Sequence, residues 1–210
     1  MDSLIYILFV AIFVPILLMA CLVEKKARQP IIFVLIGIFL SVFASEINAY
    51  LLHTLSMSAF EITIVVTPIT EEILKAFPIL LFATVCAPKK EALFTASMAV
   101  GIGFAVLENA FYLLNSTSFN MFDAIIRGFG AGLMHGMCTL LVGVGISFMR
   151  KKSKLFVVGT FALLSTAITY HGIYNMLVQS DFRLVGFLLP ITTYIPFMVW
   201  RIRKLKGKKA

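Results

Sequence analysis

Long apolar runs alternate with short polar stretches along the whole chain of 210 residues. Most runs reach about 20 residues, which is the length that an α-helix needs to cross the hydrocarbon core of a bilayer. No polar stretch is long enough to form a second domain. The pattern predicts one all-α unit over residues 1–210, a polytopic transmembrane helical bundle with about seven spans. The predicted spans are residues 3–22, 31–52, 61–86, 92–114, 123–149, 155–178 and 184–200.

The composition agrees with a membrane protein. Hydrophobic residues make up 60% of the chain and charged residues only 13%, and the mean hydropathy is +1.01. These values exclude an ordinary soluble globular domain. The first apolar run is preceded by Asp2 and followed by Lys25, Lys26 and Arg28, which reverses the charge order of a secretory signal peptide. We therefore expect this run to be an uncleaved first helix.

The basic residues are distributed unevenly between the connections. Most of the 18 Lys and Arg residues follow the first, third and fifth apolar runs or lie in the tail beyond residue 200. Because basic connections tend to stay on the cytoplasmic side, the N-terminus is predicted to lie outside and the C-terminus in the cytoplasm. The net charge of +8 thus indicates membrane topology and contact with a lipid bilayer, and no nucleic-acid partner is expected.

Several ionisable residues lie inside the apolar runs or at their edges. Each costs about 2.5–3.5 kcal/mol at the centre of a membrane helix, so a group of them indicates function more than structure. These residues are Glu46, Glu61, Glu71, Glu72, Glu108, His53, His135 and His171. Glu46, Glu61 and His53 lie near the ends of runs or in a possible connector, and we do not expect them to belong to a site.

The third run contains the sequence TPITEEILKAF, in which two carboxylates and a lysine interrupt apolar residues. Lys75 follows Glu71 by four residues and Glu72 by three, so it lies one helical turn from both carboxylates. The Thr67-Pro68 pair leaves open whether this helix begins earlier or starts afresh there, with threonine as N-cap.

The fourth and sixth runs carry polar residues at a spacing of one helical turn. In GIGFAVLENAFYL, Phe104 and Glu108 are one turn apart, and Asn109 follows directly. In YHGIYN, His171 and Asn175 lie one turn apart on a single face. Both groups are predicted to lie in the outer half of the membrane.

The fifth run places a histidine among glycines. His135 lies in GAGLMHGMCT, next to Gly128, Gly132 and Gly136, whose spacing predicts a ridge that a neighbouring helix can approach closely. Like the residues of the other three runs, His135 is predicted to lie in the outer half of the membrane. We expect the polar groups of the four helices to form one site.

Two kinds of chemistry and one structural role suit such a set of residues. A carboxylate that activates water, with histidine and asparagine donating to the oxyanion, would hydrolyse a peptide bond. A set of one glutamate and two histidines could instead hold zinc. The third alternative is a structural polar network that ties the helices together. The sequence contains no Gly-Xaa-Ser-Xaa-Gly and no His-Glu-Xaa-Xaa-His motif, and its three cysteines suggest neither disulfides nor a metal cluster.

Four short motifs, in this order, resemble the PrsW family of bacterial and archaeal intramembrane proteases. They are EEILK, FAVLEN, MHG and HGIYN, and the resemblance covers about residues 30–180. That family is distantly related to the CAAX prenyl endopeptidases, which carry EExxxR and FxxxH, and to the gamma-secretase scaffold subunit. Here Lys75 comes three residues after Glu72, and Glu108 occupies the position of the FxxxH histidine, which favours PrsW. The resemblance implies cleavage of a single-pass membrane protein, an anti-sigma factor in PrsW itself, near its extracytoplasmic side.

The roles expected on this basis divide between water activation, charge balance and oxyanion stabilisation. One of Glu71 and Glu72 activates the water, and the other orients it or binds the scissile segment. His135 supports the water or the leaving group, and His171 and Asn175 donate to the oxyanion. Glu108 and Asn109 complete the polar wall, Lys75 and Arg127 offset part of the negative charge, and Phe104 is a further supporting residue.

The metal requirement is the most open part of the prediction. Zinc ligands would be Glu72, His135 and His171, but the His171–Asn175 face is more typical of two hydrogen-bond donors. The sequence therefore favours a metal-independent glutamate protease with no cofactor, zinc being the alternative. Other functions left open are a CAAX-type endopeptidase, a proton-coupled transporter and a non-catalytic scaffold. The expected location is the plasma membrane of a bacterium or archaeon, and the oligomeric state is left open.

Overall fold

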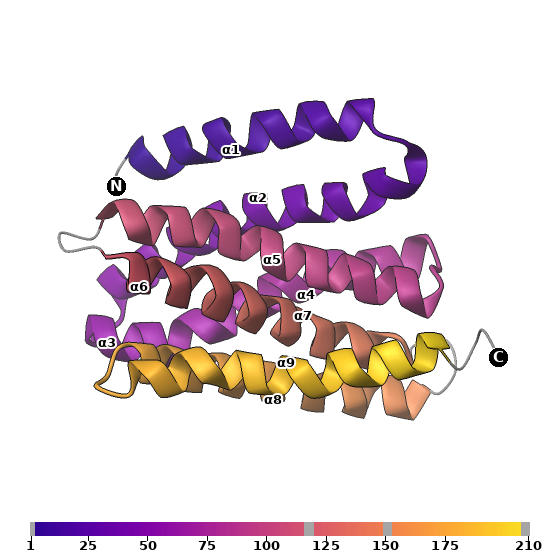
Figure 1. Cartoon of the computed structure of the whole chain (residues 1–210). Coiled ribbons are helices and arrows are strands. Elements are labelled where there is room, and N and C mark those ends of the chain that lie inside the picture. The colour runs from indigo at the N-terminus through magenta and orange to yellow at the C-terminus, as the bar shows by residue number, and fades with distance from the viewer. Residues whose placement is uncertain (1–2, 116–119, 149–152, 207–210) are drawn as a thin grey trace.

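The computed structural model describes residues 3–115, 120–148 and 153–206, and in these ranges the regular structure is entirely helical. The connections at 116–119 and 149–152 and the tail from residue 207 lie outside the described residues, and with them part of the basic residues used for the orientation. Most helices run side by side along one axis (Figure 1). The helices are α1 (Ser3–Leu22), α2 (Lys25–Thr54), α3 (Ala59–Glu61), η1 (Ile62–Val66), α4 (Thr67–Val85), α5 (Lys90–Asn115), α6 (Met121–Ile125), η2 (Ile126–Ala131), α7 (Gly132–Ile146), α8 (Ser153–Val178) and α9 (Arg183–Lys206).

Each of the predicted apolar segments is helical, and the prediction of an all-α membrane protein is confirmed. Five of the described helical stretches are long and apolar enough to cross a membrane, while Arg183–Val199 is a shorter apolar helix. The α4 helix carries three charged residues of the EEILK motif, so it is less apolar than a typical membrane-spanning helix. The number of seven spans and the orientation of the termini stay predictions.

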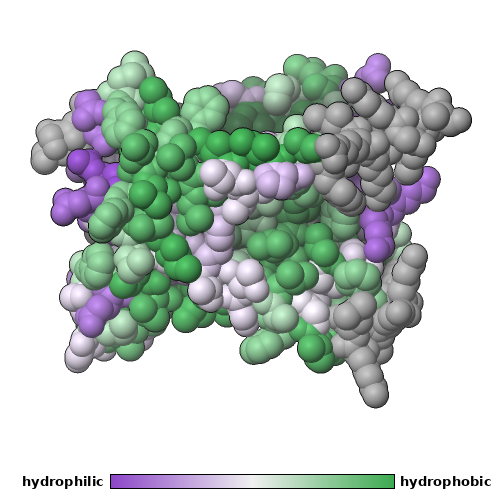
Figure 2. All heavy atoms as spheres, turned by 60° about the horizontal axis from the view of Figure 1, so that its bottom comes forward, coloured by the Kyte–Doolittle hydropathy of each residue, from purple (hydrophilic) through white to green (hydrophobic). Residues whose placement is uncertain are grey.

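The distribution of hydrophobic and hydrophilic residues on the surface supports a membrane protein. Figure 2 shows a broad hydrophobic belt between hydrophilic residues that gather toward two opposite ends of the molecule. Large side chains such as Phe77, Val85 and Phe161 are well exposed on the outside of the bundle. Exposed apolar side chains in such number suit contact with lipid acyl chains.

The third apolar segment forms one continuous helical rod from Ala59 to Val85, built from α3, η1 and α4. A capping box starts it, because the Ser58 hydroxyl accepts from the backbone N–H of Glu61 and the Glu61 carboxylate accepts from that of Ser58. The π turn η1 comes directly before the Thr67-Pro68 pair. The helix therefore begins well before this pair and only changes its hydrogen-bond register there.

The helices pack closely through glycines, but not through those that the sequence singled out. A Cβ at Gly128 or Gly132 would meet nothing within 4 Å, so the predicted ridge around His135 is wrong at these two positions. The close approaches lie elsewhere, where a Cβ would come within 2.1 Å of a backbone oxygen at Gly37 and Gly103 and within 2.2 Å at Gly101. The spacing of glycines alone does not tell which of them faces another helix.

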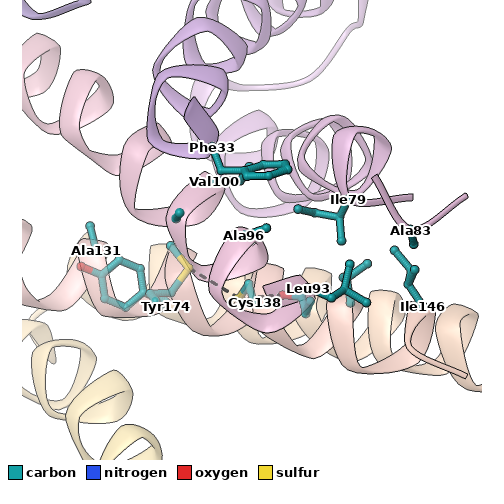
Figure 3. Packing of buried hydrophobic residues seen from close by; sticks show 14 residues of the cluster. Phe33, Ile79, Ala83, Leu93, Ala96, Val100, Ala131, Cys138, Ile146 and Tyr174 are labelled. Carbon is teal, nitrogen blue, oxygen red and sulfur yellow. Dashed lines mark hydrogen bonds between the residues drawn. The ribbon is translucent and has the colours of Figure 1, made fainter. Parts of the chain in front are cut away.

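The main apolar core lies between α2, α4, α5, α7 and α8. Val100 and Ala96 of α5 are fully buried, as are Ile79 of α4 and Cys138 of α7. Figure 3 shows these side chains meeting between the helices. This core holds α4, α5, α7 and α8 in fixed positions, and these four helices carry the polar residues singled out in the sequence.

Gly101→Ala is expected to destabilise the protein and to reduce its activity. The new methyl group would lie 2.2 Å from the carbonyl oxygen of His135, so α5 and α7 must move apart. Overpacking of this kind costs about 1–3 kcal/mol, and thermal unfolding in detergent would measure it. Gly128→Ala is the matched control, because that position is open. Equal melting temperatures for the two variants would contradict the close packing of α5 on α7.

Candidate active site

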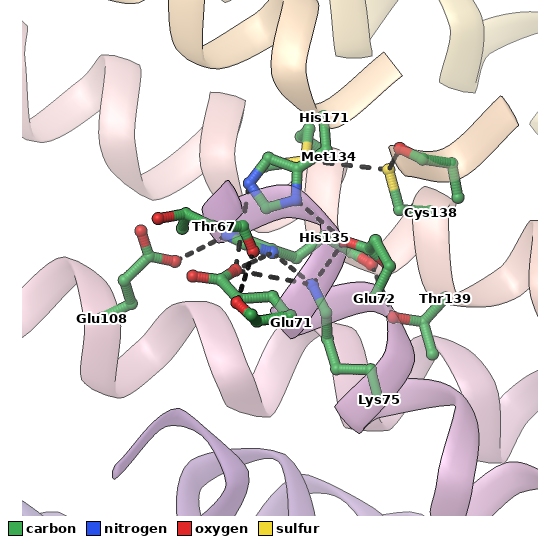
Figure 4. Close-up of polar contacts among 12 residues, drawn as sticks. Thr67, Glu71, Glu72, Lys75, Glu108, Met134, His135, Cys138, Thr139 and His171 are labelled. Atoms are coloured by element: carbon green, nitrogen blue, oxygen red, sulfur yellow. Dashed lines mark hydrogen bonds and ion pairs between the residues drawn. The ribbon is translucent and has the colours of Figure 1, made fainter. Parts of the chain in front are cut away.

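Charged and polar side chains from four helices meet inside the bundle (Figure 4). All of them except Glu108 are almost completely buried, and Lys75 and Glu72 have no exposed surface at all. Buried charges are stable only when they are paired and hydrogen-bonded. The cluster consists of Glu71, Glu72 and Lys75 from α4, Glu108 from α5, His135 from α7 and His171 from α8.

Lys75 lies at the centre of this cluster. Its ammonium nitrogen is 2.6 Å from Glu72 Oε1 and 2.8 Å from His135 Nδ1. It also lies 4.6 Å from the centre of the Phe104 ring, which is close enough for a cation–π contact. The lysine thus links two helices and neutralises part of the carboxylate charge.

Glu72 acts as a support for His171. Glu72 Oε1 lies 2.9 Å from His171 Nδ1. Because this carboxylate is already paired with Lys75, it accepts the hydrogen bond and His171 Nδ1 donates. The opposite nitrogen, Nε2, is then unprotonated and can accept a proton or bind a metal. This tautomer does not suit the predicted role of His171 as a donor to an oxyanion.

Glu71 is placed differently from its neighbour. Its Oε2 atom is buried without a hydrogen-bond partner. The same atom lies 3.9 Å from each of three nitrogens, Lys75 Nζ, His135 Nδ1 and His171 Nε2. Glu72 also has a buried Oε2 atom without a hydrogen-bond partner, but its Oε1 atom is engaged by Lys75 and His171. Glu71 differs because its unpartnered oxygen faces both histidines.

Glu108 faces the cluster from α5. Its Oε2 atom is 2.6 Å from His135 Nε2, and its Oε1 atom is 3.3 Å from the guanidinium of Arg127. Neither Glu108 Oε2 nor His135 Nε2 makes a hydrogen bond of good geometry, so the two atoms are close but not well satisfied. Arg127 in turn stacks on Tyr112, with 4.0 Å from the guanidinium carbon to the ring centre.

The two asparagines that the sequence singled out hold the backbone of the two π turns. Asn175 Nδ2 donates to the carbonyl oxygen of Thr63 in η1 at 3.0 Å. In the π register this carbonyl would need the N–H of residue 68, which is proline and has none. Asn109 Nδ2 donates to the carbonyl oxygen of Arg127 in η2 at 2.9 Å. The amide of Asn175 is thus already used, and donation to an oxyanion stays only a prediction.

The charged residues that the sequence set aside lie outside the cluster. Glu46 accepts a short hydrogen bond from Tyr6, and Glu61 belongs to the capping box. His53 is exposed. Of the neighbours that the sequence did not single out, Tyr112 could have been found from its place one turn after Glu108. Thr63 gave no such signal, because its role depends on a backbone carbonyl.

Two cavities reach the cluster from different sides. The first, which we call the α5–α8 cavity, has a volume of about 380 Å³ and is lined by His135, Arg127, Asn175 and others. The second, the α2–α4 cavity, has a volume of about 290 Å³ and is lined by Glu71 and Phe104 among others. Glu108, Thr63 and Tyr112 line both cavities. Glu108 thus stands at the boundary between them.

The donor atoms are suited to a metal ion. Ligand atoms of Glu71, His135 and His171 lie within 4.8 Å of one another, and all three residues are buried. Nitrogen and oxygen ligands of tetrahedral zinc lie about 3.3–3.5 Å apart, which is close to the 3.9 Å separations around Glu71. The zinc set expected from the sequence contained Glu72, but here the carboxylate of the group is that of Glu71.

The fold and the site together define a polytopic membrane protein with a buried glutamate–histidine centre that two cavities reach. A family model described as PrsW family intramembrane metalloprotease matches residues 25–201. The chain belongs to this family and is an intramembrane protease. The resemblance inferred from the four motifs is confirmed. No curated protein and no solved structure matches the chain.

Proposed function

We propose that the protein hydrolyses a peptide bond within a single-pass membrane protein, at the boundary between the two cavities. The observation that carries the proposal is the free Oε2 atom of Glu71, which faces three nitrogens at 3.9 Å in a buried site. A merely structural network would leave few buried oxygens without partners, because each costs about 1–3 kcal/mol. Unpaired polar atoms therefore favour a site that binds something.

Glu71, His135 and His171 are the residues that would hold a divalent metal. The set of one glutamate and two histidines is also found in catalytic zinc sites that keep a position open for water. When bound, the metal supplies Lewis acidity toward the scissile carbonyl and the attacking water. Because Lys75 Nζ lies 2.8 Å from His135 Nδ1, use of this nitrogen as a ligand requires the ammonium to shift toward Glu72.

Glu108 is the group that accepts the proton of the attacking water. Its side chain is 19% exposed, more than that of Glu71 or Glu72, and it lines both cavities. Its Oε1 atom pairs with the guanidinium of Arg127 at 3.3 Å. The hydroxide attacks the carbonyl carbon, the C–N bond breaks, and Glu108 returns the proton to the leaving amine.

The remaining residues orient these groups. Glu72 fixes the tautomer of His171 in the manner of a carboxylate that supports a ligand histidine. Lys75 balances the charge of the adjacent carboxylates. Asn109 and Asn175 hold the π turns that carry Arg127 and Thr63.

The purified protein, reconstituted into vesicles, is expected to cut some members of a panel of single-pass membrane peptides. Mass spectrometry of the products would locate the bond, which we expect within the half of the membrane on the N-terminal side of the bundle. The same vesicles without protein are the control. Substrate-dependent proton flux without any product would contradict proteolysis and support a transporter.

A further inference from the structure

We infer that the α2–α4 cavity is a subsite that binds the side chain of one residue next to the scissile bond, selects small or medium-sized side chains and excludes acidic ones. This inference rests on the proposed peptide-bond hydrolysis and adds the substrate preference of the same site.

The first step is the position of the cavity. Glu108 lines both cavities, whereas Glu71 lines only the α2–α4 cavity and His135 only the α5–α8 cavity. The cluster that would act on the peptide bond therefore lies between two spaces. An extended peptide advances about 3.3–3.6 Å per residue. Under this inference, a peptide whose bond lies at Glu108 places the residues on its two sides toward different cavities.

The second step is the wall that α2 contributes. Ser41, Ala44, Ser45, Asn48 and Ala49 line the cavity, at spacings of three or four residues that place them along one face of the helix. Side chains this small leave room beside the buried Oε2 atom of Glu71, which lines the same cavity and has no hydrogen-bond partner. The α2–α4 cavity is thus in contact with Glu71, a residue that would act on the substrate.

The third step is the charge of the two cavities. Among the described residues that line the α2–α4 cavity, Glu71 and Glu108 are the charged ones, and the rest are apolar or neutral. An acidic side chain of a substrate would be repelled there. The α5–α8 cavity differs, because Asp123, Arg127 and Arg183 also line it. The exclusion of acidic residues is therefore assigned to the α2–α4 side.

Ala49→Leu tests the subsite, since it extends one small wall residue into the cavity without touching the cluster. The variant and the wild type are given model single-pass peptides in which the residue on each side of the cleaved bond is changed from Gly to Ala, Leu, Phe and Asp. We expect kcat/KM of the variant to fall about tenfold or more for Leu and Phe at one of the two positions. With Gly or Ala there, cleavage should stay within about twofold of wild type.

Two further variants make the result decisive. Ser45→Leu narrows the same wall from the preceding turn and should shift the same position of the substrate. Ala162→Leu makes the same exchange at an exposed position of α8 and should leave the profile unchanged. A uniform loss for all peptides, or an unchanged size preference in both wall variants, would overturn the subsite while leaving proteolysis intact. Absence of cleavage by the wild type would refute proteolysis and the subsite with it.

Discussion

Glu108→Gln is expected to lower cleavage by about 10²–10⁴-fold, which is the usual contribution of a general base, while the bound metal stays in place. Glutamine keeps the shape of the side chain but cannot take a proton. The ligand atoms of Glu71, His135 and His171 are not changed by this substitution. Cleavage of a single-pass peptide and elemental analysis of the same preparation measure the two properties side by side.

Glu71→Gln serves as the contrasting variant and is expected to lose both cleavage and metal. Glu72→Gln should lower activity by about 10–100-fold, as is typical of a residue that orients a ligand. The matched control is Glu61→Gln on the same helical rod, because glutamine also completes a capping box. If Glu108→Gln cleaves normally and Glu71→Gln keeps the metal, Glu71 is the base and the roles proposed for the two residues are wrong.

Exhaustive dialysis against a strong chelator is expected to abolish cleavage, and zinc alone should restore it. About one zinc per chain should be bound before dialysis. A ligand that binds only the folded state adds about 2.7 kcal/mol of stability at a concentration 100 times its Kd. The melting temperature should therefore fall on dialysis and rise again with zinc, independently of any activity measurement.

His171→Ala should remove this zinc-dependent stabilisation, whereas His53→Ala should keep it, because His53 is exposed and outside the cluster. Activity that survives dialysis, with well under one zinc per chain, would contradict the metal centre. It would support instead the metal-independent mechanism that the sequence favoured.

The sequence predicted the helical architecture because its apolar runs are long and contain few polar residues. It also predicted that α4, α5, α7 and α8 contribute to one polar cluster, since Glu71, Glu108, His135 and His171 are too polar for lipid. Their buried contacts agree with this expectation. The assignment of catalytic roles to these residues stays a proposal.

Other features could not be read from the sequence. Glu71 and Glu72 are adjacent and chemically identical, and only the position of His171 shows which of them is engaged. The spacing of Asn175 from His171 suggested two donors on one face, but the lack of an N–H at Pro68 gives the asparagine a backbone carbonyl to satisfy. The role of each of these side chains depends on its partners from distant helices. Which residues are these partners depends on the three-dimensional packing.

The π turn η1 also bears on how the length of the chain can vary. A π turn holds one residue more than the α-helical geometry would use. Loss of one residue from Ile62–Val66 would therefore leave the number that a plain α-helix needs, so the helical parts on either side could keep their directions. A deletion elsewhere in the Ala59–Val85 rod has no such surplus residue to remove and would turn the two parts by about 100° relative to each other. Within this rod, Ile62–Val66 is thus the segment at which loss of a single residue is tolerated best.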